Sequence, residues 1–201
     1  MEPVVDVPQL LKVHASGELE GNTRVYQKHL REMTGVYRDD AAYGAAVEAN
    51  GPDHLVYEVH EHKYRTGPGA LIVGTSNLLP GRYGDEFAVT RGHLHAIADR
   101  AELYYCLSGH GVMLLETIDG QTQAVELRAG EAVDVPGHWI HRSVNVGDEP
   151  FVTLFCYGSD AGQDYQIIED AGGTAALVVA TDGGWTTRPN PDHVGYRAAS
   201  K

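Results

Sequence analysis

The chain has 201 residues, 42% of them hydrophobic and 21% charged, a composition typical of a globular protein with a single domain. Its formal net charge of −13 argues against nucleic acid or an anionic membrane as a partner, because both require a basic surface. No apolar run approaches the roughly 20 residues of a membrane span. The first residues, MEPVVDVPQLLKVH, lack the basic region and apolar core of a secretion signal, so we expect a cytoplasmic protein.

Residues 1–50 are predicted to form an N-terminal extension that packs on the main domain. Their composition is mixed, and they contain one plausible short helix. Asp39 or Asp40 would be its N-cap, its interior is rich in alanine, and Asn50 and Gly51 would end it.

From Leu55 onward the pattern changes to short runs rich in Val, Leu, Tyr and Thr, each ended by turn residues. The runs are LVYEVHEHKY, GALIVGTSNLLPG, EFAVT, ELYYCLSG, GVMLLETIDG, QAVELRAGEAVDVPG, HRSVNVGDEP and FVTLFCYG. Asp119 and Gly120 between two of them predict a tight hairpin. Many short, evenly spaced strands predict an all-β sandwich or barrel over residues 51–182. The Gly- and Pro-rich residues 183–201 are predicted to form a surface tail.

A set of metal-ligand residue types stands out in this β region. His93 and His95 lie one residue apart, and Glu102 follows seven positions after the second. Alternate side chains of a strand share a face, so the two imidazoles would point the same way and Glu102 could face them across the sheet. His141 follows in PGHWIHRSVN. Three imidazoles and one carboxylate suit Mn, Fe, Ni or Zn and leave positions open for water or substrate.

Other histidines and the cysteines are assigned structural roles. His60 and His62 form a second pair, but no carboxylate or later histidine is placed to complete a site, so a solvated strand face is predicted. Cys106 and Cys156 lie in apolar runs and are predicted to be buried, unpaired thiols.

The order GHLHAIADRAE…GHG followed by PGHWIHRSVN resembles the two motifs of the cupin superfamily. More narrowly, PGRYGDEFAVTRGHLH, AELYYCLSGHGVMLL, VPGHWIHRSVNVGDEPF and YGSDAGQDYQII resemble the cupin-type glucose-6-phosphate isomerases, and the resemblance covers most of the chain. It implies an all-β cupin barrel, a double-stranded β-helix or jelly roll. It also implies one divalent transition metal per chain, most often Fe or Mn, with Ni or Zn as alternatives, and a homodimer. Exposed strand edges that need cover also favour a dimer.

Carried over position by position, the resemblance assigns individual roles. The metal ligands would be His93, His95, Glu102 and His141, and Glu102 could also move a proton. The sugar phosphate would contact Ser76, Thr90, Gly92, Tyr104, Tyr157 and Gln163.

Three of the positions depart from the family pattern. Ser76 replaces the usual Thr, Gln163 the usual His and His138 the usual Tyr. His138 is therefore a second candidate for acid–base catalysis. Arg91 and Arg142 are assigned to solvent, because adjacent strand positions alternate faces.

The implied activity is a metal-dependent aldose–ketose isomerisation that interconverts glucose 6-phosphate and fructose 6-phosphate, a step of glycolysis and gluconeogenesis. Two alternatives remain on the same barrel, because a fold does not fix a function. One is another metal-dependent cupin enzyme, either a dioxygenase or an isomerase of a different phosphorylated substrate. The other is a non-catalytic, sugar-binding cupin.

Overall fold

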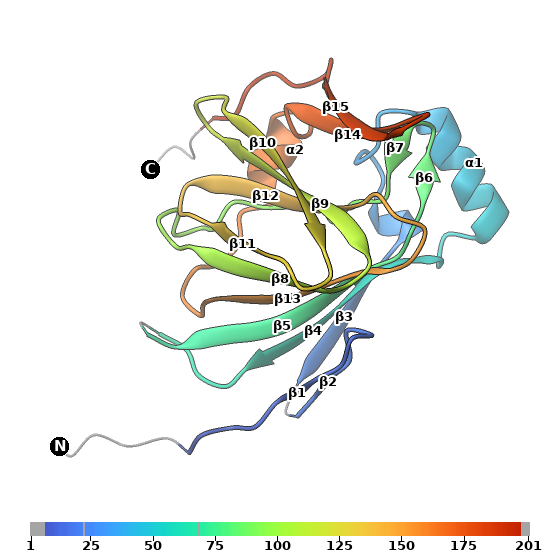
Figure 1. The fold of residues 1–201 in the computed structure, drawn as a ribbon. Coiled ribbons are helices and arrows are strands. Elements are labelled where there is room, and N and C mark those ends of the chain that lie inside the picture. Colours follow the sequence, from blue (N-terminus) through green and yellow to red (C-terminus); the bar gives the residue numbers. More distant parts are fainter. Residues whose placement is uncertain (1–6, 22, 68, 198–201) are drawn as a thin grey trace.

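All eight apolar runs lie in sheets of the computed structural model, which describes residues 7–21, 23–67 and 69–197 (Figure 1). The strands are β1 Lys12–Val13, β2 Leu19–Glu20, β3 Arg24–His29, β4 Leu55–Lys63, β5 Leu71–Leu78, β6 Arg82–Tyr83, β7 Glu86–Phe87, β8 Glu102–Ser108, β9 His110–Thr117, β10 Thr122–Arg128, β11 Ala132–Val135, β12 Trp139–Asn145, β13 Phe151–Gly158, β14 Ala176–Thr181 and β15 Gly184–Pro189. The helices are α1 Asp40–Asn50 and α2 Gln166–Asp170, with a 3₁₀ turn at Leu30–Glu32.

In the described part of the chain, the strands form sheets of six, four, three and two strands. The six-stranded sheet has the order β11-β8-β13-β5-β4-β3, and the three-stranded sheet has the order β10-β9-β12. These two sheets face each other across the core (Figure 1). Asp119 and Gly120 turn the chain between β9 and β10, which confirms the predicted hairpin.

Strand alternation decides which side chains enter the barrel. On β8, Glu102, Tyr104 and Cys106 are buried, whereas Leu103 and Tyr105 between them are exposed. The same alternation on β13 buries Phe155 and Tyr157 against the opposite sheet. The period of two therefore directs both polar and aromatic side chains of the six-stranded sheet toward one interior.

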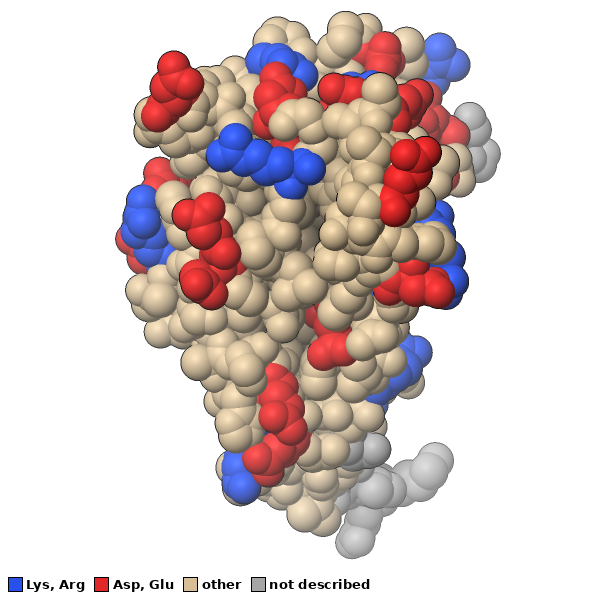
Figure 2. All heavy atoms as spheres, turned by 90° about the vertical axis from the view of Figure 1, so that its right-hand side faces the viewer, with Lys and Arg blue, Asp and Glu red and all other residues tan. Residues whose placement is uncertain are grey.

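Helix α1 follows the sequence prediction closely. The Asp39 carboxylate accepts a hydrogen bond from the backbone N–H of Ala42 at 2.9 Å, so Asp39 is the N-cap. The helix ends at Asn50, and Gly51 donates to the carbonyl of Val47. The helix lies beside β6, on the side of the molecule that Figure 2 turns toward the reader. Acidic side chains are spread over that face with fewer basic ones among them, in line with the net charge.

The predicted N-terminal extension and C-terminal tail both contain strands. Strand β3, from the predicted extension, pairs with β4 and forms one edge of the six-stranded sheet. The predicted tail contains β15, which pairs with β14 along its whole length. Most described residues of this tail are exposed, but Asn190 is buried, and beyond β15 Tyr196 is buried and donates to the buried carboxylate of Glu116. Within the described residues, no helix is long and apolar enough to cross a membrane.

A small second core covers the outer face of β12. Ile167 and Ile168 of α2 pack there with Leu94 and Ile140. This cluster matters for the site, because Leu94 anchors the segment that carries His93 and His95.

Candidate metal centre and adjoining cavity

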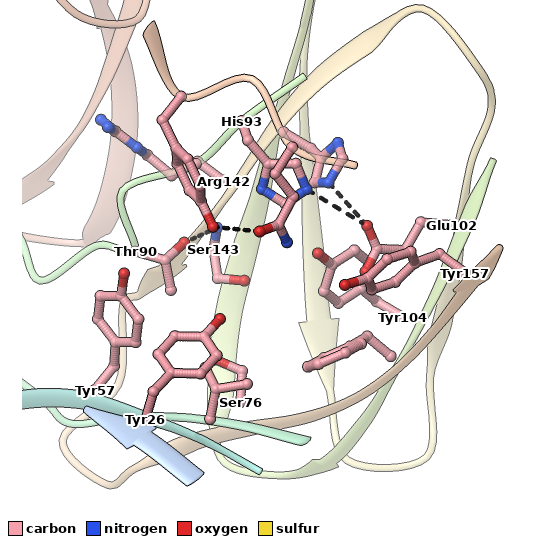
Figure 3. A pocket seen from close by; sticks show the side chains of 16 residues that line it. Tyr26, Tyr57, Ser76, Thr90, His93, Glu102, Tyr104, Arg142, Ser143 and Tyr157 are labelled. Atoms are coloured by element: carbon pink, nitrogen blue, oxygen red, sulfur yellow. Dashed lines mark hydrogen bonds and ion pairs between the residues drawn. The ribbon is translucent and has the colours of Figure 1, made fainter. Parts of the chain in front are cut away.

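The four predicted metal-ligand residues converge inside the barrel. Glu102 is the first residue of β8 and His141 lies on β12, while His93 and His95 come from the segment between β7 and β8. One ligand atom from each lies within 4.8 Å of all the others, and all four side chains are buried. Figure 3 shows His93 directed at the Glu102 carboxylate.

The segment that carries the two histidines is a short bridge rather than a regular strand. His93 and His141 exchange two backbone hydrogen bonds, of 3.1 and 3.0 Å, and Leu94 pairs in the same way with Asp164. The alternation of a strand is kept, so Leu94 enters the second core and the imidazoles on either side of it face Glu102. Gly92, just before the bridge, has a φ of 71°, in the left-handed region that favours glycine.

Backbone carbonyls orient two of the three imidazoles. Nδ1 of His95 lies 2.8 Å from the carbonyl oxygen of Arg100, and Nδ1 of His141 lies 3.0 Å from that of Trp139. A ring that donates Nδ1–H to a carbonyl directs the lone pair of Nε2 at the opposite side, as metal-binding histidines do. Nε2 of His93 is buried and has no hydrogen-bond partner among the described residues, as expected of an atom that ligates a metal.

The spacing of the ligand atoms fits a metal ion. Nε2 of His141, His95 and His93 lie 3.0, 3.1 and 4.0 Å from Oε2 of Glu102. With metal–ligand bonds of about 2.1 Å, one ion can contact atoms that are separated by distances of this size. The four ligand atoms are therefore close enough together to hold a single ion.

The charges inside the cluster are strongly coupled. Burial opposes ionisation of Glu102, but hydrogen bonds from His141 and His95 outweigh it and hold the pKa of the carboxyl at about 2. Burial lowers the pKa of His95, yet its contacts with Glu102 and the Arg100 carbonyl outweigh this effect and the pKa lies above its ordinary value. Burial lowers the pKa of His93 well below its ordinary value, so that imidazole is neutral.

A cavity opens beside the cluster, between the two facing sheets. Its inner part has a volume of about 60 Å³, and an outer vestibule of about 400 Å³ adjoins it. The two share Tyr26, Tyr57, Gln163 and Tyr165 in their linings. The inner part alone holds a few water molecules, so a larger ligand must extend into the vestibule or widen the wall between them.

Comparison with known proteins gives the family. A sequence profile described as Glucose-6-phosphate isomerase (GPI) matches residues 27–194. This chain belongs to the glucose-6-phosphate isomerase family. The protein named Glucose-6-phosphate isomerase of Sinorhizobium medicae (strain WSM419) is 47% identical over 171 residues, which are 85% of this chain and 79% of that one. The protein of the same name from Thermococcus litoralis is 39% identical over 170 residues, 85% of this chain and 88% of that one.

A more distant likeness is found among solved structures. The structure titled "Structural and spectroscopic insights into the mechanism of oxalate oxidase" has a TM-score of 0.44 and 19% identity, and the match covers 54% of each chain. The family prediction is thus confirmed by the sequence comparisons, and the all-β cupin barrel expected of it is the observed fold.

The structure brings together the residues that the family resemblance assigns to substrate. All six line the inner cavity: Ser76, Thr90, Gly92, Tyr104, Tyr157 and Gln163. Oγ of Ser76 is buried without a hydrogen-bond partner among the described residues. Oγ1 of Thr90 accepts from the backbone N–H of Ser143 at 3.1 Å, so its hydroxyl proton stays available for a ligand.

His138 lies outside this cavity, contrary to the proposed catalytic role. Its side chain is exposed, and it is absent from the residues that line the inner cavity or the vestibule. The residue turns the chain between β11 and β12 with a φ of 72°. This turn directs the imidazole away from the barrel interior.

Arg142 corrects a second prediction. Strand alternation does place it on the face of β12 opposite to His141, but that face is covered, and the side chain is 6% exposed. Arg91 is half-buried, pairs with Glu169 and lies over the ring of Tyr165. The expectation that Arg142 faces solvent was therefore wrong, because alternation does not tell which face is covered, whereas Arg91 is partly exposed.

The cavity lining also contains residues that were not anticipated: Tyr26, Tyr57, Val59, Arg142, Ser143, Phe155 and Tyr165. Strand parity could have found several of them, because Ser143 shares the face of His141 and Phe155 that of Tyr157. Tyr26 could not be predicted from the sequence, because β3 lies in a segment of mixed composition.

Two tyrosines of the cavity already donate their hydroxyl protons to neighbouring side chains. Tyr157 donates its hydroxyl proton to the buried carboxylate of Glu61 at 3.2 Å. Tyr165 donates to the side-chain oxygen of Gln163 at 2.5 Å. A phenol has a single proton, so in this arrangement both Tyr oxygens offer lone pairs rather than donors to a ligand.

The second histidine pair and the two cysteines do not belong to the metal cluster. Among the described residues, the one cluster that could hold a metal is the one above, and His60 and His62 are not part of it. His60 contacts Glu58 at 2.7 Å and His62 is buried, so this pair does not lie on a solvated face as predicted. Cys106 and Cys156 are both free thiols, the first buried and the second half-buried.

Proposed function

We propose that this protein is a metal-dependent aldose–ketose isomerase that interconverts glucose 6-phosphate and fructose 6-phosphate. The observation that carries the proposal is the convergence of three imidazoles and one carboxylate at the wall of the inner cavity. Nε2 of His93 has no hydrogen-bond partner there among the described residues. The names of the relatives agree with this activity.

The metal would be held by His93, His95, Glu102 and His141. Three imidazoles and one carboxylate suit Fe or Mn, with Ni or Zn as alternatives. When bound, such an ion supplies Lewis acidity to the negative charge that develops on the C1 and C2 oxygens of the sugar. Glu102 is ionised at neutral pH, so its carboxylate can take up a proton at one carbon and return it to the next.

The phosphate group would lie against neutral donors, because the −13 charge of the protein repels it at long range. The free hydroxyls of Ser76 and Thr90 can donate to it. So can the backbone N–H of Gly92, which makes no hydrogen bond within the described residues. Tyr157 would instead accept a hydrogen bond from a sugar hydroxyl, since its proton is held by Glu61.

A coupled assay tests the proposal. Purified protein supplied with Mn²⁺ or Fe²⁺ should convert fructose 6-phosphate to glucose 6-phosphate, whereas fructose should react far more slowly because it lacks the phosphate. Glu102→Gln should abolish most of the rate. His138→Phe, which changes an exposed side chain outside the cavity, is the matched control and should keep it. Absence of turnover with every divalent metal tried would exclude this activity.

A homodimer is part of the proposal. Strand β3 lies at one edge of the six-stranded sheet and exposes Val25, and β11 lies at the other. Such edges are normally covered, and a second copy of the chain would do so. Light scattering coupled to gel filtration should give twice the monomer mass of 21.8 kDa, and a monomer at micromolar concentration would refute it.

A further inference from the structure

A second cavity lies behind the catalytic one, on the other side of Gly92 and Arg142. Its volume is about 440 Å³, within the range of cavities that bind small molecules. Its wall combines the loop around residues 32–38, the Arg91–Gly92 segment, Arg142 of β12, and residues 168–173 at the end of α2. It shares Gly92, Arg142 and Tyr165 with the inner cavity.

Arg142 is a buried cation whose hydrogen bonds are incomplete. Its Nη2 donates to the carbonyl of Arg91 at 2.6 Å, but its Nε has no partner among the described residues. The nearest buried carboxylates are engaged elsewhere. Glu86 accepts from the backbone N–H of Arg38, and Glu116 accepts from the N–H groups of Ala175 and Ala176. In Figure 3 the Arg142 side chain extends away from Glu102, so it does not serve the metal cluster.

Burying a guanidinium without a hydrogen-bonded carboxylate partner is unfavourable. An anion bound in the cavity would offset that cost. The cavity wall is suited to one, because Arg38 and Arg91 line it as well.

These two arginines are only partly satisfied by the protein. Nε of Arg38 is buried without a partner among the described residues. Its Nη1 lies 3.3 Å from the carboxylate of Asp192 and 3.4 Å from the carbonyl oxygen of Gly172, longer than a typical charged hydrogen bond. Arg91 pairs with Glu169 at the rim. Glu32, the other acid of the wall, is bound to Lys28 and His29. Three arginines and two glutamates therefore line the cavity, and Asp192, which is not part of the lining, pairs with Arg38. Arg142 is the arginine of this wall for which no ion pair is found among the described residues.

We propose that this cavity is a second anion site, which binds orthophosphate or the phosphate group of a small phosphate monoester. Planar guanidinium groups with parallel N–H donors match the oxygens of a phosphate, which makes this class of ligand the best fit. The site is distinct from the catalytic cavity and goes beyond the proposed isomerase activity. Because Gly92 and Arg142 border both cavities, and Arg142 adjoins His141, a bound anion would also affect the affinity for substrate.

Calorimetric titration of the purified protein with inorganic phosphate tests this site without any turnover. Two classes of binding should appear, one weakened by Ser76→Ala and the other by Arg38→Gln or Arg91→Gln. Loss of one charged hydrogen-bond pair should weaken the second class about 10- to 100-fold. Arg128→Gln removes the same charge from an exposed ion pair on β10 and should change neither class.

The same variants distinguish a failure of this proposal from a failure of the proposed isomerase activity. Arg38 braces the loop at residue 35, so Arg91→Gln provides a second test if Arg38→Gln does not fold. Because Arg91 also lines the vestibule of the catalytic cavity, this test requires that Arg91→Gln leave the class that depends on Ser76 unchanged. Phosphate binding by both variants with the wild-type affinity, or a single class of sites that Ser76→Ala removes, would overturn the second site. An inactive protein that still shows two classes would contradict the isomerase alone.

Discussion

Replacement of Gly92 by Ala should destabilise the protein and damage the metal centre. With a φ of 71°, any L-residue here costs about 1–2 kcal/mol. A Cβ built on Gly92 would also lie 2.9 Å from Cβ of Arg142, 2.9 Å from the carbonyl oxygen of His141 and 3.1 Å from Cδ1 of Ile168. Forcing an extra methyl group into such a packed region adds about 1–3 kcal/mol. We therefore expect a loss of roughly 2–5 kcal/mol in the free energy of unfolding.

Gly120→Ala is the matched control. Gly120 also has a positive φ, of 88°, but a Cβ there meets nothing within 4 Å in the described part of the chain. Gly120→Ala should therefore lower the free energy of unfolding only by the cost of the backbone conformation, about 1–2 kcal/mol. Urea denaturation measures both free energies. In a chain of this size 1 kcal/mol corresponds to about 2–4 °C in Tm, so thermal unfolding gives a second reading.

The steric argument also predicts a functional difference. The carbonyl that the new methyl group would displace accepts from the backbone N–H of His93, so Gly92→Ala should lower metal affinity while Gly120→Ala does not. If the two variants are destabilised equally and bind metal equally, crowding at Gly92 is not what selects glycine there.

Four further outcomes test the site. Glu102→Gln should lower the rate about 10²- to 10⁴-fold yet keep most of the metal, measured by elemental analysis, and a fully active variant would remove Glu102 from the chemistry. His141→Ala should weaken metal binding by more than the about 10- to 100-fold typical of losing an outer hydrogen-bond partner, whereas His60→Ala should not, and equal losses would mean that the ligands are misassigned. Because the pKa of His95 is raised and a metal must displace its proton, metal affinity should rise with pH through that pKa and fall below it, and a chelator competition that is flat with pH would contradict this. Ser76→Ala should lower kcat/KM for fructose 6-phosphate about 10- to 100-fold, and an unchanged value would exclude Ser76 from phosphate binding.

Much of the site follows from strand parity and motif order. The spacing of His93, His95 and Glu102 needs only alternation and one turn to bring the side chains together, and the bridge to His141 completes the set. Tyr104 shares the parity of Glu102, and its place in the cavity follows from the same rule.

Strand alternation does not predict which segments cover the outer face of each strand. Arg142 alternates as expected, but α2 and the loop at residues 32–38 cover its face, and neither contact is encoded near it in the sequence. His138 has the residue type of an acid–base catalyst, yet its turn geometry directs it outward. Asp182 and Gly183 between β14 and β15 are typical of a tight hairpin turn. The Gly- and Pro-rich composition of the residues that follow obscured this pattern.

In the proposed function, isomerisation depends on one metal ion held by the three imidazoles and Glu102. The most direct measurement is a titration of activity against added metal, starting from protein stripped by a chelator and shown by elemental analysis to be metal-free. We expect no conversion of fructose 6-phosphate at the start, then a linear rise and a plateau at one Fe²⁺ or Mn²⁺ per chain. The stripped protein should stay folded, because a chain of about 200 residues has a sufficient core of its own. Full activity in folded, metal-free protein would show that the reaction needs no metal.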